Sequence, residues 1–131
     1  MKLRVIVLAL LAAAVVLVVS CGPPPVSISD RIAMFVSDIN SNPGNAYTEC
    51  DPNAGQYNAA KTANFWTSLF RNPTYTTSGL NDSNSSAVTV TFNGLGGAEF
   101  WTFGMVNNKN MGSDNWLISK VINASGSTVF Q

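Results

Sequence analysis

Histidine is absent from this chain of 131 residues, and only 11% of the residues carry a charge. Without histidine the chain lacks the commonest general base and metal ligand, which excludes Ser-His-Asp and Cys-His catalysis. Its seven Lys and Arg form no basic cluster of the kind that neutralises nucleic-acid phosphates. We therefore expect no catalytic residues of these types, no cofactor, no metal site and no nucleic-acid partner.

Cysteine is also scarce, with two residues in the chain, and the first follows an apolar N-terminal segment. Lys2 and Arg4 form a short cationic head, and the run Val5–Val19 contains neither a charge nor a proline. This arrangement is typical of a secretion signal. A helix that crosses a bilayer needs about 20 apolar residues, and this run has fifteen. We expect a cleaved signal peptide over residues 1–20, with a permanent transmembrane span as the weaker alternative.

The end of this segment, Val18-Val19-Ser20-Cys21, resembles the lipobox of bacterial lipoproteins. The resemblance implies a diacylglyceryl thioether on the Cys21 sulfur, cleavage before Cys21, and acylation of its new amino group, for example with palmitate. Each buried methylene contributes about 0.8 kcal/mol, and more than one chain makes such an anchor stable. Gly22 is not the aspartate that often retains these lipoproteins at the inner membrane, so the outer membrane of a cell that has one is favoured. The alternative is an ordinary signal with an incidental cysteine.

One domain with a modest core is expected after cleavage, because about 110 residues remain. The prolines Pro23–Pro25 favour an extended, semi-rigid conformation. We therefore predict a lipidated cysteine with its tether over residues 21–26 and a single α+β domain over residues 27–131. Five Lys and Arg then face seven Asp and Glu, a side-chain balance of −2. Cys50 is expected to be a buried thiol, with an intermolecular disulfide as the alternative.

Two helices are predicted in the first half of the domain. The first begins at Ile28, because Ser27 and Asp30 fit a capping box and apolar residues recur at helical spacing. Asn42-Pro43-Gly44 ends this helix, residues 45–55 are predicted to form a turn, and a second helix follows over residues 56–70. The apolar stripe of the first helix consists of Ile28, Ile32, Phe35, Val36 and Ile39, and its polar side consists of Asp30, Arg31, Ser37 and Asp38.

The apolar pattern changes to alternation after Pro73, which predicts strands joined by short turns. Helices followed by consecutive hairpins define an α+β fold, with a curved antiparallel sheet packed on the N-terminal helices. Residues 79–86 are predicted to form a polar loop, and Gly94-Leu95-Gly96-Gly97 a hairpin turn rather than a phosphate-binding loop. The predicted strands are Tyr75–Ser78, Val88–Phe92, Glu99–Val106, Trp116–Ile122 and Ser127–Phe130.

This order of elements resembles the nuclear-transport-factor-2-like cone superfamily over residues 26–131. The resemblance rests on the amphipathic first helix, on Phe65-Trp66 and Leu69-Phe70 in the second helix, and on the closing strand Trp116-Leu117-Ile118-Ser119-Lys120-Val121. It implies a strongly bent sheet wrapped around helices as a cone. In different members the interior of the cone binds a small hydrophobic ligand, hosts catalysis or only packs, so the resemblance bears on fold far more than on function.

A candidate ligand pocket follows from the predicted strand Glu99–Val106, which is apolar on both faces and needs cover on both. One face can pack on the helices, and the other can meet a second layer, a partner or a cavity. Glu99 is in phase with Trp101, so it either lies on the wall of a cavity or begins its strand in solvent. The candidate pocket residues are Trp66, Phe92, Glu99, Trp101, Phe103, Met105 and Trp116, and the alternative is that the aromatic ones only fill the core.

An enzymatic interpretation would pair a carboxylate base with a tyrosine or a second acid, as enzymes of the cone superfamily often do. No catalytic motif of that superfamily can be transferred to this chain residue by residue. The spacing of Asp82 and Asp114 fits no EF-hand loop, so we expect both to lie in solvated turns. The groups available for such a pair are Glu99, Asp51 and Asp114 with Tyr47, Tyr57 and Tyr75.

The sequence thus favours a non-enzymatic envelope protein, anchored to the membrane lipid through Cys21, that binds a small apolar ligand or acts as an accessory subunit. The alternative is an interaction module whose exposed sheet face docks another envelope protein or a second copy of the chain as a homodimer. An exposed apolar patch would support the interaction module, whereas an enclosed cavity would support the ligand carrier. A cone-fold enzyme is the third interpretation.

Overall fold

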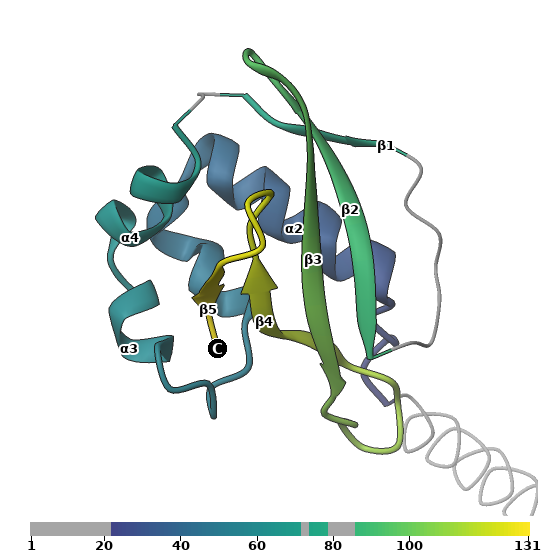
Figure 1. The fold of residues 1–131 in the computed structure, drawn as a ribbon. Coiled ribbons are helices and arrows are strands. Elements are labelled where there is room, and N and C mark those ends of the chain that lie inside the picture. The colour runs from purple at the N-terminus through teal and green to yellow at the C-terminus, as the bar shows by residue number, and fades with distance from the viewer. Residues whose placement is uncertain (1–21, 72–73, 79–85) are drawn as a thin grey trace, which may run out of the picture.

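The computed structural model describes residues 22–71, 74–78 and 86–131 of the chain (Figure 1). Within these ranges the helices come first and a five-stranded antiparallel sheet follows, which confirms the predicted α+β class and the strand meander. The predicted signal over residues 1–20, the lipobox cysteine Cys21, and all but the last residue of the predicted loop 79–86 lie outside the described residues.

Helix α2 (Ile28–Ser41) begins where its capping residue predicts. The Ser27 hydroxyl accepts a hydrogen bond from the Asp30 backbone N–H at 3.1 Å and donates one to the Asp30 carboxylate at 2.7 Å. Asn42 closes the helix directly before Pro43, whose ring cannot continue it. The predicted apolar stripe faces the core, with Ile28, Ile32, Phe35 and Val36 buried and Ile39 partly buried.

The prediction that Arg31 lies on the polar side of α2 is wrong, because the structure buries its side chain. The position is three residues after Ile28 and four before Phe35, which puts it at the border of the apolar stripe. A buried guanidinium needs a charged or hydrogen-bonding partner, and Glu49 supplies one from the segment that follows α2.

The chain between α2 and the sheet differs from the prediction in two places. The expected turn begins within a 3-10 helix, η1 (Pro43–Glu49), and the expected single helix is divided into α3 (Tyr57–Ala60) and α4 (Ala63–Leu69). The division has a local cause, since the Trp66 indole N–H donates to the Ala60 carbonyl at 2.8 Å. In a continuous helix that carbonyl would instead accept the backbone N–H four residues later.

The sheet has the strand order β1-β2-β3-β4-β5, so each strand pairs with its neighbour in sequence. Leu95 and Gly96 form the turn between β2 and β3, and Gly97 after it has a φ of 105° that favours glycine. The predicted bounds of the fourth strand are confirmed, and the others agree to within a few residues. The strands are β1 (Thr76–Ser78), β2 (Ala87–Gly94), β3 (Gly97–Asn107), β4 (Trp116–Ile122) and β5 (Thr128–Phe130).

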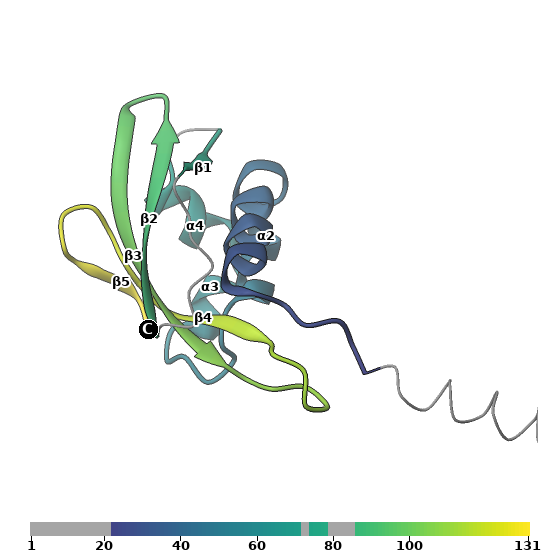
Figure 2. The same cartoon turned by 90° about the vertical axis from the view of Figure 1, so that its right-hand side faces the viewer.

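The helices lie on one side of the sheet, as Figures 1 and 2 show from two directions. Burial along β2 and β3 alternates accordingly, so that every second side chain enters the core and its neighbours point the other way. Among the described residues, none of the helices has both the length and the hydropathy that a membrane span requires.

Candidate functional site

The inner face of the sheet, toward the helices, gathers five of the seven candidate pocket residues. Trp66 from α4 and Phe92, Trp101, Phe103 and Met105 from the sheet are all buried, none exposing more than 4% of its surface. The aromatic rings of this set pack against one another and against two further rings of the helical layer, Phe35 and Phe70. The ring centroids of Phe70 and Trp101 are stacked 4.6 Å apart, those of Phe35 and Trp66 are 5.0 Å apart edge-on, and those of Phe35 and Phe103 are 5.7 Å apart.

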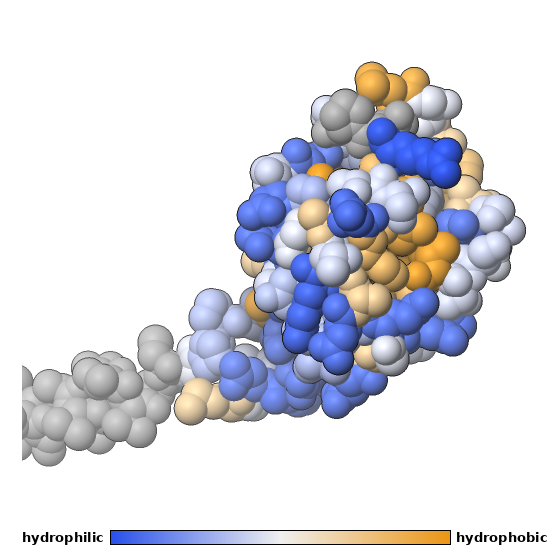
Figure 3. Space-filling model, turned by 90° about the vertical axis from the view of Figure 1, so that its left-hand side faces the viewer, coloured by the Kyte–Doolittle hydropathy of each residue, from blue (hydrophilic) through white to orange (hydrophobic). Residues whose placement is uncertain are grey.

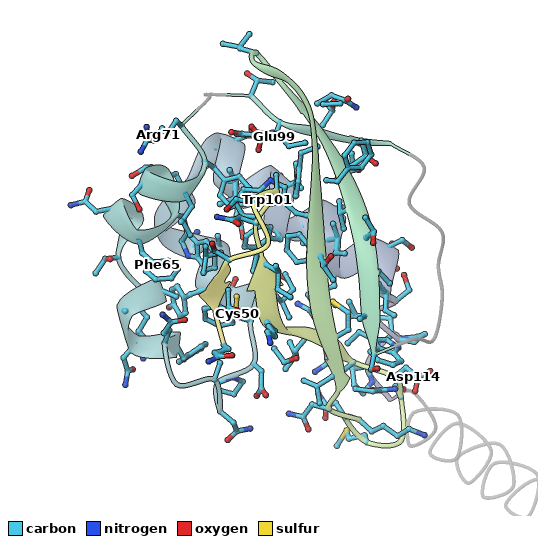
Figure 4. The ribbon with its side chains drawn as sticks, viewed as in Figure 1. Cys50, Phe65, Arg71, Glu99, Trp101 and Asp114 are labelled. Carbon is cyan, nitrogen blue, oxygen red and sulfur yellow. The ribbon has the colours of Figure 1, made fainter. Side chains whose placement is uncertain are left out.

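The other two candidates, Glu99 and Trp116, lie at the margins of this aromatic core. Glu99 is half-buried and its carboxylate accepts a hydrogen bond from the Trp101 indole N–H at 2.9 Å, so it satisfies a polar group of the core (Figure 4). Trp116 is partly buried at the start of β4. Glu99 thus neither lines a cavity nor lies free in solvent. It is half-buried at the end of the inner face and hydrogen-bonded to Trp101.

The remaining carboxylates of the enzymatic interpretation have roles in turns. Asp51 accepts hydrogen bonds from the Asn53 backbone and side chain at 3.0 Å. Asp114 is half-exposed and accepts one from the Asn107 side-chain amide at 2.8 Å. Within the described ranges, no three His, Cys, Asp or Glu side chains are grouped as they would be around a metal ion.

The tyrosines of that interpretation lie in two environments. Tyr47 and Tyr57 meet edge-on with their centroids 5.6 Å apart, and the Lys61 ammonium lies 5.0 Å from the Tyr57 ring. Burial raises the pKa of Tyr57, and Tyr47 adds to the rise. Tyr75 is buried, and its ring packs edge-on against Phe70 at 5.2 Å.

A buried ion pair between Arg31 and Glu49 was not expected from the sequence. The guanidinium donates to the Glu49 carboxylate, to the Asn115 side-chain oxygen at 2.7 Å and to the Trp116 carbonyl at 2.5 Å. The second Glu49 oxygen accepts from the Thr48 hydroxyl at 2.9 Å. The pair therefore joins α2 and η1 to the beginning of β4. The one sequence signal for it was the position of Arg31 at the border of the apolar stripe.

Burial and the charge of Glu49 together raise the pKa of two neighbouring groups, the Cys50 thiol and the Asp38 carboxyl. Burial raises the pKa of the Cys50 thiol far above its usual range, and Glu49 adds to the rise while Arg31 opposes it. Cys50 is a free, buried thiol, as predicted, and such a thiol is a poor nucleophile because the thiolate is the reactive form. Burial likewise raises the pKa of Asp38, with a further contribution from Glu49.

The outer face of the sheet is the side that no described helix covers. Phe100 is 64% exposed there and Val106 is 36% exposed. Gly104 lies between them on β3, where a Cβ would come within 2.9 Å of the Lys120 Cβ, so glycine allows β3 and β4 to approach closely. We define the outer face by Thr76, Ala87, Thr89, Thr91, Asn93, Ala98, Phe100, Thr102, Gly104, Val106, Leu117, Lys120, Ile122 and Thr128, which the strand register assigns to this side.

The surface around α3 and α4 has a different character. Figure 3 views the molecule from this end and shows an apolar area surrounded by hydrophilic side chains. Phe65 and Leu69 of α4 and Val129 of β5 are partly buried and pack against the core. Their rings and methyl groups are therefore largely engaged within the molecule, in contrast to Phe100 on the outer face.

Comparisons with protein-family models, curated proteins and solved structures gave no match for this chain. The proposed function therefore depends on the burial of the two sheet faces and on the sequence of the N-terminal segment.

Proposed function

We propose that the chain is a lipid-anchored envelope protein of non-enzymatic type, in which a nuclear-transport-factor-2-like cone domain serves as an accessory binding module. We further propose that the module docks through the outer face of its sheet to a second copy of the chain. The contrast between the two faces is the observation that carries this proposal. The inner face is filled by side chains of the domain itself, whereas the outer face exposes Phe100 and Val106.

The closed inner face favours docking over the transport of a small apolar ligand. Neighbouring rings such as Phe92 and Trp101 lie with their centroids 6.0 Å apart, at the distance of ordinary core contacts. A ligand among them would have to displace these contacts. The outer face can accept a partner without any such rearrangement.

The chemistry of the outer face suits burial against another protein surface. Lys120 is its only charged residue among those the structure describes. Thr91 pairs with Phe100, and Leu117 pairs with Val106. Cores of protein interfaces are depleted of charge and enriched in aromatic residues. Two copies could therefore pair here with little loss of charge hydration.

The position of the tether supports a second copy as the partner. The Val26 N–H donates to the Asp114 carbonyl at 2.8 Å, and the Trp116 N–H donates to the Val26 carbonyl at 3.2 Å, so the tether joins the sheet beside the β3–β4 connection. The β2–β3 turn lies at the opposite end of the molecule (Figure 1). A twofold axis along the membrane normal would then bring two outer faces together, with their strands aligned as in packed sheets.

Native mass spectrometry of the chain from Gly22 onward, exported to a bacterial periplasm, tests the proposal. The expected spectrum has two copies and no added mass. Phe100→Glu is expected to weaken pairing at least about 10-fold, which corresponds to about 1.4 kcal/mol. Leu95→Glu is the matched control, because Leu95 is 77% exposed at the β2–β3 turn and should leave the dimer intact.

Two results would contradict the proposed docking. A single copy at every protein concentration would show that the outer face does not bind itself. A discrete adduct that disappears in Trp101→Ala would favour a carrier of a small ligand, and its mass would give the chemical class.

A further inference from the structure

The β3–β4 turn, Asn110–Ser113, has a backbone conformation that suits Gly112 but not Met111. Asn110 and Ser113 exchange backbone hydrogen bonds at 3.0 and 2.9 Å, and the two residues between them have φ values of 50° for Met111 and 85° for Gly112. Two central residues with positive φ define a type I′ turn, in which asparagine or glycine is preferred at both positions. Met111 is the one non-glycine residue with positive φ in the part of the chain that the structure describes.

Packing within the domain does not account for methionine at this position. Met111 is 85% exposed, which is the largest value among the exposed large hydrophobic side chains of the described residues. Its neighbour Lys109 also extends into solvent, with 66% of the side chain exposed, and its ammonium lies 4.0 Å from the half-exposed Asp114 carboxylate. The turn therefore presents an apolar side chain and a cation together, at a cost in backbone strain that the isolated domain does not recover.

The turn lies directly beside the point where the tether begins. A Cβ built on Gly22 would be 3.6 Å from the Ser113 hydroxyl oxygen and 3.8 Å from the Met111 carbonyl oxygen. Gly22 directly follows Cys21 in the sequence. If Cys21 carries acyl chains, as proposed above, the turn is held close to the membrane surface in which those chains sit.

We infer that the β3–β4 turn is a membrane contact in which Met111 enters the headgroup region beside the lipid anchor and Lys109 faces the phosphates of anionic phospholipids. Methionine is flexible and polarisable and adapts to an irregular apolar environment. The backbone groups of Asn110 and Ser113 already hydrogen-bond to each other. Fewer backbone polar groups therefore lose a hydrogen-bond partner when the turn enters the headgroup region. This second contact fixes the orientation of the domain, with the β2–β3 turn pointing away from the membrane.

An environment-sensitive fluorophore tests this inference in the full chain, produced in bacteria so that it is lipidated. The dye is attached to Met111→Cys, and to Leu95→Cys at the opposite end of the molecule as the matched control. Cys50 is buried and should not react in the folded protein. The labelled proteins are placed in vesicles of phosphatidylethanolamine and phosphatidylglycerol. We expect a blue-shifted emission and quenching by spin-labelled lipid at position 111, and an emission typical of water at position 95.

The outcomes separate this inference from the proposed anchor on which it rests. If the protein does not float with the vesicles, and Cys21→Ser behaves identically, the lipid anchor is refuted. If the protein floats but the dye at position 111 reports water, the anchor stands and the membrane contact of the turn is refuted. Equal shielding at positions 111 and 95 would also overturn the inference, because the domain would then have no fixed orientation.

Discussion

At the scale of single residues, Arg31 and Glu49 are two buried charges that neutralise each other as an ion pair. Each residue is only 8% exposed, and the guanidinium has three partners, from η1, from Asn115 and from the Trp116 carbonyl. A buried pair often contributes little compared with apolar residues of the same size, but removal of one partner leaves an uncompensated charge. The stability of the domain should therefore depend strongly on keeping the pair complete.

We predict that Glu49→Leu lowers the free energy of unfolding by about 3–5 kcal/mol, because Arg31 then keeps a buried charge without a counter-ion. The double variant Arg31→Met with Glu49→Leu should recover most of that loss. Urea unfolding followed by tryptophan fluorescence measures both effects. Lys109→Met is the control, since its exposed pair with Asp114 spans 4.0 Å and should change stability by no more than about 1 kcal/mol. Equal losses in Glu49→Leu and Lys109→Met would contradict the prediction.

Asp38 gives a prediction for pH. Burial and the Glu49 charge raise the pKa of Asp38 above its ordinary value of 3.8, so the folded state binds this proton more tightly than the unfolded state does. The contribution of Asp38 to stability is therefore most favourable at low pH and falls as pH rises from near 3.8 through the raised pKa. Asp38→Asn should gain stability relative to the natural chain across that window. Urea titrations at a series of pH values measure the difference, and a difference that does not vary with pH would refute the assignment.

At the scale of elements, two short connections depart from regular structure for different reasons. The break between α3 and α4 has a visible compensation, because Trp66 fills the core and its indole N–H takes the Ala60 carbonyl. The β3–β4 turn has no such compensating contact among the described residues, since Met111 has a positive φ and its side chain is exposed. A strained residue without internal compensation suggests a role outside the fold.

We predict that Met111→Gly stabilises the soluble domain by up to about 1 kcal/mol, because glycine adopts a positive φ without the steric cost that methionine has. Gly112→Ala at a φ of 85° is the matched variant of opposite sign and should destabilise the domain by about 1 kcal/mol or more. Thermal unfolding of the two variants measures both changes. A loss of stability in Met111→Gly would show that the methionine is retained for the fold itself.

At the scale of the whole molecule, the two proposals describe one arrangement. The tether and the β3–β4 turn lie together at one end of the sheet, and the β2–β3 turn lies at the other (Figures 1 and 2). A contact of Met111 with the membrane would hold β2 and β3 upright. The outer face would then stand at right angles to the membrane plane, where a second anchored copy can approach it from the side.

Much of the local structure could be predicted from the sequence. The bounds of α2 and β4 follow from Ser27, from Asn42-Pro43 and from apolar periodicity, because caps and periodicity act over a few neighbouring residues. The meander followed because consecutive strands joined by short turns pair with one another. The burial of Cys50 was also predicted correctly from its residue type.

Tertiary structure alone decided the features that depend on distant partners. Arg31 could be buried only because Glu49, Asn115 and the Trp116 carbonyl converge on it from later parts of the chain. Likewise, the approach of Gly22 to the β3–β4 turn joins residues about ninety positions apart, and no local pattern encodes that distance. The sequence by itself determined most of the helices and strands, whereas folding determined which charge is buried, which sheet face stays open and which turn lies beside Gly22.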